Sequence, residues 1–198
     1  MAQTRRQFRQ YIRQQRNQLD ETIQMHAAAQ LLSQCQTLPE LAISQHIALY
    51  LSNDGEIDTQ PLIELLWSQG KQVYLPVLHP FSPGHLLFLH YHQHTPMMTN
   101  KYGIFEPKLD QTQVKPIEQL DLVFTPLVGF DSQGHRLGMG GGYYDRSLAR
   151  WFATGVGPTP IGLAHDCQHV ERLPTEEWDV PLPKIVTPSR IWHWEFKH

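Results

Sequence analysis

The sequence predicts an α/β fold: a single domain with a largely parallel, twisted sheet flanked by helices, in a Rossmann-like topology. Two observations favour this fold. Short apolar runs separated by turn residues alternate with stretches of helical length, and strand-helix-strand units of this kind build parallel sheets. A cluster of four glycines also lies between a strand-like and a helix-like segment, which is where α/β proteins place ligands.

Two helices are expected at the N-terminus. Thr4 is placed to cap the first, whose apolar positions around Ile12 fall near helical spacing opposite an arginine-rich face. Asp20 is placed to cap the second, which carries an apolar stripe through Leu31 and ends before Pro39. The chain therefore begins with two helices before the sheet starts.

The rest of the chain reads as strands separated by two further helices. The candidate strands are apolar runs bounded by turn residues, at 46–52, 72–78, 85–92, 120–130, 160–165 and 184–194. Residues 61–69 and 143–151 have the length and composition of helices. The helix at 143–151 directly follows the glycine cluster, so the cluster is expected at a helix N-terminus.

Length and composition restrict the class of protein. With 198 residues, of which 40% are hydrophobic, the chain can bury one sizeable core and is too short for two comfortable domains, so we expect a single domain over 1–198. A net charge of -3 argues against a surface built to hold nucleic acid. No apolar run approaches the roughly 20 residues that a membrane span needs. Two distant cysteines fit a reducing cytoplasm.

The segment 136–146, RLGMGGGYYDR, is the most informative part of the sequence. Each glycine in ordered structure costs roughly 0.5–1 kcal/mol relative to alanine, so this cluster indicates a backbone that a ligand approaches closely. Free N–H groups at a helix N-terminus bind anions, and a phosphate is the expected ligand. The segment matches neither the Walker pattern nor the dinucleotide-binding pattern.

The charged residues around the glycines indicate which ion accompanies the phosphate. Arg136 and Arg146 flank the cluster and can pair with phosphate oxygens. Asp145 would repel a phosphate by about 1 kcal/mol at 4 Å in water, and a bridging Mg²⁺ removes that conflict if a second acid is close. The alternative is a close-packed turn in which both arginines make structural ion pairs and Asp145 favours the helix N-terminus.

Four segments in order resemble the 5-formyltetrahydrofolate cyclo-ligase family, also called the methenyltetrahydrofolate synthetases. They are the arginine-rich first helix, 51–58 (LSNDGEID), 129–146 and 173–180 (LPTEEWDV). The resemblance covers nearly the whole chain. It implies an ATP- and Mg²⁺-dependent ligase that converts 5-formyltetrahydrofolate to 5,10-methenyltetrahydrofolate and releases ADP and phosphate. The γ-phosphoryl group of ATP activates the formyl oxygen, and the folate nitrogen N10 then attacks the activated carbon, so no protein nucleophile is required.

The resemblance also implies roles for individual residues. The catalytic residues would be Arg136 and Asp145, and Mg²⁺ would be held by Asp145 and Asp179. The ATP-binding residues would be Arg5, Arg9, Arg136, Leu137, Gly138, Met139, Gly140, Gly141, Gly142, Tyr143 and Tyr144. The folate-binding residues would be Leu51, Glu56, Met139, Gly140, Gly141, Gly142 and Tyr143. The chain departs from some family members that carry a lysine at the position of Gly141. The implied partners are small molecules, with no nucleic acid or membrane, and the implied state is a monomer.

Other readings of the sequence remain open. A different ATP- or phosphate-binding enzyme could use the same fold. A non-enzymatic nucleic-acid-binding module could use the arginine-rich helix, with Arg5 and Arg9 on a solvated basic face. The alternating histidines at 90, 92 and 94 are compatible with zinc, although a surface strand also explains them. The tripeptide 165–167, His-Asp-Cys, reads as a strand end near the site rather than as a nucleophile.

Overall fold

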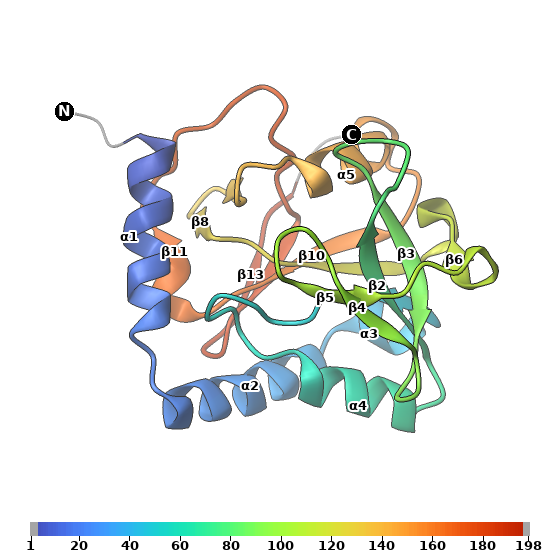
Figure 1. The fold of residues 1–198 in the computed structure, drawn as a ribbon. Coiled ribbons are helices and arrows are strands. Elements are labelled where there is room, and N and C mark those ends of the chain that lie inside the picture. The colour runs from blue at the N-terminus through green and yellow to red at the C-terminus, as the bar shows by residue number, and fades with distance from the viewer. Residues whose placement is uncertain (1–3, 196–198) are drawn as a thin grey trace.

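The computed structural model describes residues 4–195, so both ends of the expected 1–198 domain lie outside the described residues. A central eight-stranded sheet has the order β13-β12-β10-β7-β1-β2-β3-β6. Its five middle strands run parallel, and the strands at both edges are antiparallel to their neighbours. Helices flank this sheet (Figure 1). The predicted fold class is confirmed.

The helices and strands have the following bounds. The α-helices are α1 (Arg5–Asn17), α2 (Glu21–Cys35), α3 (Pro39–Ile43), α4 (Gln60–Ser68) and α5 (Tyr143–Thr154). The strands of the large sheet are β1 (His46–Ala48), β2 (Gln72–Leu78), β3 (Leu86–Tyr91), β6 (Val114–Lys115), β7 (Leu122–Thr125), β10 (Thr159–Leu163), β12 (Lys184–Val186) and β13 (Ile191–His193). The smaller sheets contain β8 (Gly129–Asp131), β9 (Arg136–Leu137) and β11 (His169–Val170), and β4 (Met97–Thr99) with β5 (Phe105–Pro107). Short 3₁₀ helices are η1 (Gln111–Gln113), η2 (Ile117–Gln119) and η3 (Asp166–Gln168).

The period-two alternation of the strands builds two cores, one on each face of the sheet. Ile47 of β1 packs in a cluster with residues of α2 and α4, such as Leu31 and Leu66. Ala48, the next residue, belongs to the opposite face with Val123 and, at its margin, Tyr144 of α5. Successive strand side chains point to opposite faces, so these short, largely apolar strands are buried on both sides.

The first helices begin at the predicted caps. The Thr4 hydroxyl accepts a hydrogen bond from the Gln7 backbone N–H at 3.3 Å, and the Gln7 side chain accepts from the Thr4 N–H at 2.8 Å. Asp20 Oδ1 accepts from the Ile23 N–H at 2.8 Å and starts α2. Figure 1 shows α2 and α4 along one side of the large sheet, and α1 standing beside the small sheet that contains β8.

Two segments predicted as single strands each form two separate strands. Residues 120–130 form β7 and then β8, which belongs to a different sheet. Pro126 lies between them and cannot donate a ladder hydrogen bond. Residues 184–194 form the antiparallel pair β12 and β13, with Val186 opposite Ile191. The intervening turn contains Pro188 and is closed by the Thr187 N–H, which donates to the Arg190 carbonyl at 3.0 Å.

Other differences concern length and direction. The expected strand 46–52 ends at Ala48. The strand at 85–92 is confirmed as β3, but it pairs antiparallel with β2 because the connection between them is too short for a crossover. Sequence reasoning missed the β4–β5 hairpin, which follows β3 along the chain and is labelled near the centre of Figure 1. Among residues 4–195, no helix combines the length and the apolar character that crossing a membrane requires.

Ion pairs between arginines of α1 and Asp54 hold the helix against the loop that follows β1. Arg16 is fully buried, and its guanidinium donates to the Asp54 carbonyl at 2.9 Å and to Asp54 Oδ2 at 2.8 Å. Arg13 Nε donates to the same Oδ2 at 2.7 Å, and its side chain is 43% exposed. Asp54 sits in the left-handed region at φ 51°, which is uncommon for a non-glycine residue. The arginine contacts therefore hold a strained turn in place.

We expect Arg16→Ala to lower the free energy of unfolding by about 3 kcal/mol, because it leaves a cavity where a fully buried side chain stood and removes two of the hydrogen bonds to Asp54. Arg13→Ala should cost less than about 1 kcal/mol, because exposed pairs contribute little. Urea denaturation of both variants measures the two values. Equal effects of the two substitutions would contradict the role given to burial.

Candidate active site

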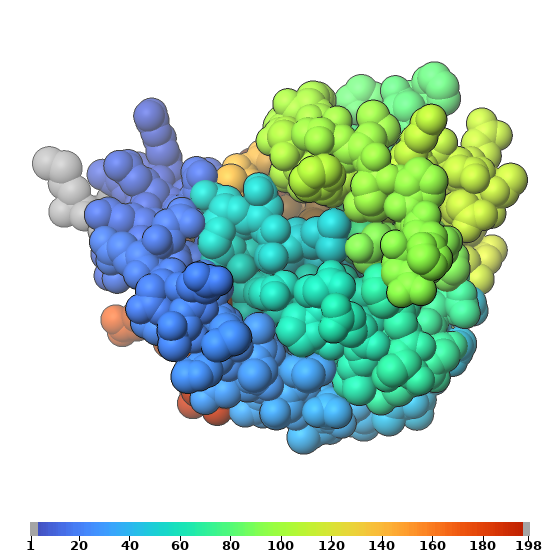
Figure 2. All heavy atoms as spheres, turned by 60° about the horizontal axis from the view of Figure 1, so that its bottom comes forward, coloured from blue at the N-terminus to red at the C-terminus, as the bar shows by residue number. Residues whose placement is uncertain are grey.

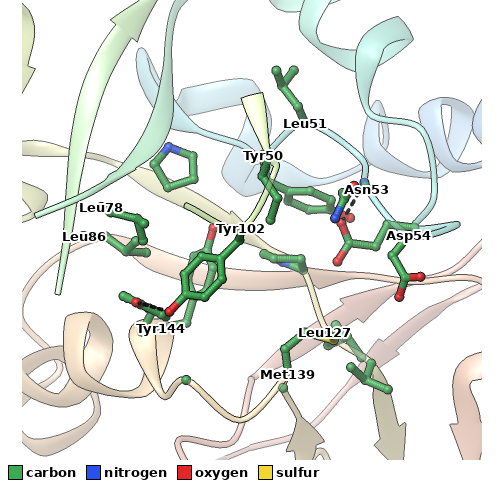
Figure 3. Close-up of a pocket in the computed structure, with 18 of the residues that line it drawn as sticks. Tyr50, Leu51, Asn53, Asp54, Leu78, Leu86, Tyr102, Leu127, Met139 and Tyr144 are labelled. Atoms are coloured by element: carbon green, nitrogen blue, oxygen red, sulfur yellow. Dashed lines mark hydrogen bonds between the residues drawn. The ribbon is translucent and has the colours of Figure 1, made fainter. Parts of the chain in front are cut away.

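A cavity of about 730 Å³ opens between the end of β1, the β4–β5 hairpin and the glycine loop, residues 138–142. Figure 2 shows the surface hollowed between the segment after β1, in cyan, and the hairpin, in green. Figure 3 shows side chains from these segments facing one another, with Leu51 and Asp54 on one side and Leu78 and Leu86 on the other. The cavity thus lies beyond the carboxyl end of a central parallel strand, where α/β proteins bind ligands.

Most of the predicted site residues line this cavity. Those that do are Leu51, Glu56, Arg136, Gly138, Met139, Gly141, Gly142, Tyr143, Tyr144 and Asp145. The others, Arg5, Arg9, Leu137, Gly140 and Asp179, lie outside its lining. Leu137 is buried in β9, opposite Gly129 of β8. The remaining four cluster around the glycine loop on its α1 side, as the contacts below show.

The glycine loop requires glycine at two positions. Gly142 has φ 64° and precedes the first turn of α5, and Gly140 has φ 105°; both conformations disfavour residues with a side chain. Arg9 of α1 also approaches the loop, and its Nε donates to the Gly138 carbonyl at 2.8 Å. A Cβ at Gly140 would lie 3.6 Å from the Arg9 guanidinium. The glycine loop therefore packs closely against Arg9 of α1.

Arg136 and Asp145 form a buried pair at the base of the loop. Arg136 Nη2 donates to Asp145 Oδ1 at 2.5 Å, and the Val180 N–H donates to the same oxygen at 3.1 Å. Burial lowers the pKa of Arg136, while Asp145 and Asp179 oppose that change. Arg136 Nε is buried without a partner within 4–195. The guanidinium thus retains hydrogen-bonding capacity next to the loop.

Asp179 is held by α1. Both of its oxygens accept from the Arg5 guanidinium, one of them at 2.9 Å, and Oδ2 also accepts from the Glu176 N–H at 2.9 Å. This hydrogen-bonded pairing raises the pKa of Arg5. Because Asp179 and Asp145 both act on the pKa of Arg136, the two predicted metal ligands lie near the same guanidinium.

The donor set suits Mg²⁺ that arrives with a nucleotide. Within the described chain, Asp145 Oδ2 accepts no hydrogen bond, whereas both Asp179 oxygens do. No three His, Cys, Asp or Glu side chains of residues 4–195 form a metal cluster. Magnesium is commonly held by one or two carboxylates together with substrate phosphates, so Asp145, with Asp179 beside it, fits this ion.

The loop after β1 presents Glu56 to the cavity. The Asn53 N–H donates to Glu56 Oε2 at 3.1 Å, and the Glu56 N–H donates to the Asn53 carbonyl at 3.0 Å, so the turn at Asp54 fixes the side chain. Burial raises the pKa of Glu56 to about 7; Arg16 opposes this rise and Asp54 adds to it. A carboxylate held there in a partly desolvated setting is a strong acceptor for paired N–H donors.

Aromatic side chains complete the walls. The hydroxyls of Tyr50 and Tyr144 are buried and have no partner in the described part of the chain. Burial raises the pKa of both hydroxyls, and Glu56 adds to the effect. Across the cavity, the hydroxyls of Tyr102 in the hairpin and Tyr143 in α5 lie 3.1 Å apart. Figure 3 shows Tyr102 in front of the cavity, close to the glycine loop.

Sequence reasoning missed several of these residues. Arg13 and Arg16 follow Arg9 at helical spacing, a stripe that could have predicted a shared partner. The adjacent Asp54 and Gly55 form a typical turn dipeptide. Nothing local marked Tyr50, Tyr102 or Glu106, because these residues reach the cavity only when β1, the β4–β5 hairpin and α5 pack around it.

The structure does not support two of the alternatives. His94 donates from its backbone N–H to His92 Nδ1 at 3.1 Å, as in a turn, and the three histidines form no metal cluster among residues 4–195. Arg5 and Arg9 contact Asp179 and the glycine loop rather than lying on a wholly solvated face. His165 is buried, which lowers its pKa to about 4, and Cys167 belongs to η3 outside the cavity lining.

Comparison with known proteins identifies the family. A model of the 5-formyltetrahydrofolate cyclo-ligase family matches residues 1–188. The chain belongs to the 5-formyltetrahydrofolate cyclo-ligase family. The members are ligases, and ATP-dependent cyclisation is the family's activity. The predicted family resemblance is confirmed.

Individual relatives cover almost the whole chain. The 5-formyltetrahydrofolate cyclo-ligase of Escherichia coli K12 is 53% identical over 185 residues, which are 92% of this chain and 100% of that protein. The one from Haemophilus influenzae is 53% identical over 93% of this chain and 98% of that protein. The solved structure of Aquifex aeolicus 5,10-methenyltetrahydrofolate synthetase superposes with a TM-score of 0.80 at 29% identity, covering 98% of this chain and 96% of that one.

The raised pKa of Glu56 predicts a pH-dependent cost of folding. Between its unfolded pKa, about 4.3, and its folded pKa the unfolded chain binds fewer protons, so stability falls as pH rises through this window and is constant above it. Glu56→Gln removes the cost, and we expect it to gain roughly 1–2 kcal/mol of stability at pH 8 relative to its effect at pH 5. Chemical denaturation at both pH values measures this. Glu64→Gln, on an exposed position of α4, is the matched control and should show no such gain.

Proposed function

We propose that this chain cyclises 5-formyltetrahydrofolate to 5,10-methenyltetrahydrofolate with consumption of ATP and release of ADP and phosphate. The observation that carries the proposal is one cavity bounded by two chemically different walls. Glu56 lies on one wall, and the glycine loop with Arg136 and Asp145 lies on the other. A folate ring and a triphosphate can therefore meet in the same enclosed space.

The glycine-loop wall suits phosphoryl transfer. The formyl oxygen forms a bond to the γ-phosphorus while the bond from that phosphorus to the β-bridging oxygen breaks, and ADP leaves with the electron pair. The chain supplies backbone N–H groups at the start of α5, the partly unsatisfied guanidinium of Arg136, and Arg9 against Gly138. Fixed donors of this kind stabilise charge that develops in the transition state. Mg²⁺ held by Asp145 and Asp179 would neutralise phosphate charge.

The Glu56 wall suits the folate. Its carboxylate can accept two hydrogen bonds from the amino-pyrimidine edge of the pterin, with Leu51 packing beside the ring. This orientation places N10 for attack on the activated formyl carbon. A new carbon–nitrogen bond forms, N10 loses its proton, and the carbon–oxygen bond breaks to release phosphate. Positioning of the two reactants provides most of the acceleration.

We also propose that the protein works as a monomer in the cytoplasm. Cys35 and Cys167 are both free thiols, which suits a reducing compartment. All the residues assigned to the two substrates come from this one chain, so no second copy is needed to complete the site.

The reaction is tested by following methenyltetrahydrofolate absorbance after mixing the protein with 5-formyltetrahydrofolate, ATP and Mg²⁺. We expect product to form only when all three are present, with one ADP released for each product, and chelation of the metal to stop it. Hydrolysis of ATP without the absorbance would contradict the proposed folate substrate.

Asp145→Asn should reduce kcat by at least about 100-fold, because it removes charge from the metal and phosphate site. It should also lower the melting temperature, because the buried Arg136 loses its counter-ion, so activity is measured well below that temperature on protein shown to be folded. Asp110→Asn, an exposed acid outside the cavity lining, is the matched control and should keep full activity. Arg136→Ala is less informative, because Arg136 is buried and paired and its loss would also destabilise the fold. Normal turnover by Asp145→Asn would contradict its catalytic role.

A further inference from the structure

Glu106 is a buried carboxylate that lines the cavity without a counter-ion. The acids in the cavity wall are Asp54, Glu56, Glu106 and Asp145. Asp54 pairs with two arginines and Asp145 pairs with Arg136. Glu106 is 8% exposed and makes no ion pair among the described residues. A buried charge without a partner is costly, so we expect a ligand to supply a partner for this carboxylate.

The Glu106 side chain is fixed in orientation. Its Oε2 accepts from the Leu78 backbone N–H at 3.2 Å and from Asn100 Nδ2 at 3.0 Å. Asn100 is fixed in turn, because its Oδ1 accepts from the backbone N–H groups of Tyr102 at 2.9 Å and Ile104 at 3.2 Å. Oε1 accepts no hydrogen bond from residues 4–195. These contacts therefore hold one oxygen and leave the other for a ligand, as in binding sites whose contact residues are themselves fixed by hydrogen bonds.

The surroundings of Glu106 favour the folate over the nucleotide. The neighbouring wall is apolar, with Leu78, Leu86 and Ile104, and a phosphate there would be repelled by the carboxylate. The basic residues that suit a triphosphate, Arg5 and Arg9, lie on the α1 side of the glycine loop and outside the cavity lining. A reduced folate carries several N–H donors and apolar rings, which match a carboxylate in an apolar wall.

We propose that Glu106 is a second folate-binding residue, whose Oε1 accepts a hydrogen bond from an N–H group of the bound reduced folate. The inference rests on the proposed function, since it names a further contact for the same substrate. The cavity then holds the folate between two unpaired carboxylates, Glu56 on the loop after β1 and Glu106 on β5. The hairpin becomes part of substrate recognition.

Glu106→Gln tests this contact with little change of shape. The amide oxygen can still accept from Leu78 and Asn100, while the position of Oε1 becomes an N–H₂ donor that opposes the substrate donor. We expect the KM for 5-formyltetrahydrofolate to rise at least about tenfold and the KM for ATP to stay within about twofold, because a hydrogen bond to a charged group is lost. Glu118→Gln, an exposed acid that pairs with Arg150 at 3.4 Å, is the control and should change neither constant.

A binding measurement separates this inference from the proposed function. The shift in melting temperature produced by 5-formyltetrahydrofolate alone, without ATP, is compared for the unmodified protein and Glu106→Gln. The ligand-free variant should melt no lower than the unmodified protein, because a buried unpaired charge has been removed, and its folate-induced shift should be smaller. Equal shifts, no shift in either protein, or a rise in the KM for ATP instead of folate would overturn the role of Glu106. Absence of product from the unmodified protein, with its folate-induced shift intact, would overturn only the proposed reaction.

Discussion

The carboxylate of Asp54 is the contact on which the site depends. It receives hydrogen bonds from Arg13, Arg16 and Asn17, all on α1, and so joins the first helix to the loop that carries Glu56. Asp54 has an unfavourable backbone conformation, which is kept only where surrounding contacts hold it in place. The position of Glu56 is therefore set both by the local bonds to Asn53 and by a helix that precedes it by about 40 residues.

Arginines along the whole of α1 make similar contacts with other segments. Arg5 binds Asp179, Arg9 binds the glycine loop at Gly138, and Arg13 and Arg16 bind Asp54. One helix thus aligns three segments that are far apart in sequence, two of them through a carboxylate and the third through a backbone carbonyl. Of the four acids that line the cavity, Asp54 and Asp145 pair with arginines, whereas Glu56 and Glu106 make no ion pair among the described residues. Charge that the fold does not neutralise is available to a substrate, which is how binding sites differ from structural ion pairs.

Local patterns in the sequence predicted the fold well, and they failed where distant contacts decide. The caps at Thr4 and Asp20, the strand at 72–78 and the helix after the glycine cluster were confirmed, because each depends on neighbouring residues. The splits at Pro126 and Pro188 could have been predicted from the prolines themselves. The Asp54 anchor and the place of Glu106 could not, because they arise from packing between elements. The ligand roles of individual residues in the glycine loop rest on the family resemblance and stay predictions.

The pairing of Arg5 with Asp179 also bears on how the native structure forms. These residues are separated by 174 positions in the chain, so α1 is held by a contact of very long range in sequence. Contacts of such long range form late and slow the search for the native state. An arrested or truncated chain that lacks the final twenty or so residues would present an arginine-rich helix with no acidic partner for Arg5. The native placement of Arg5 therefore requires the segment around Asp179.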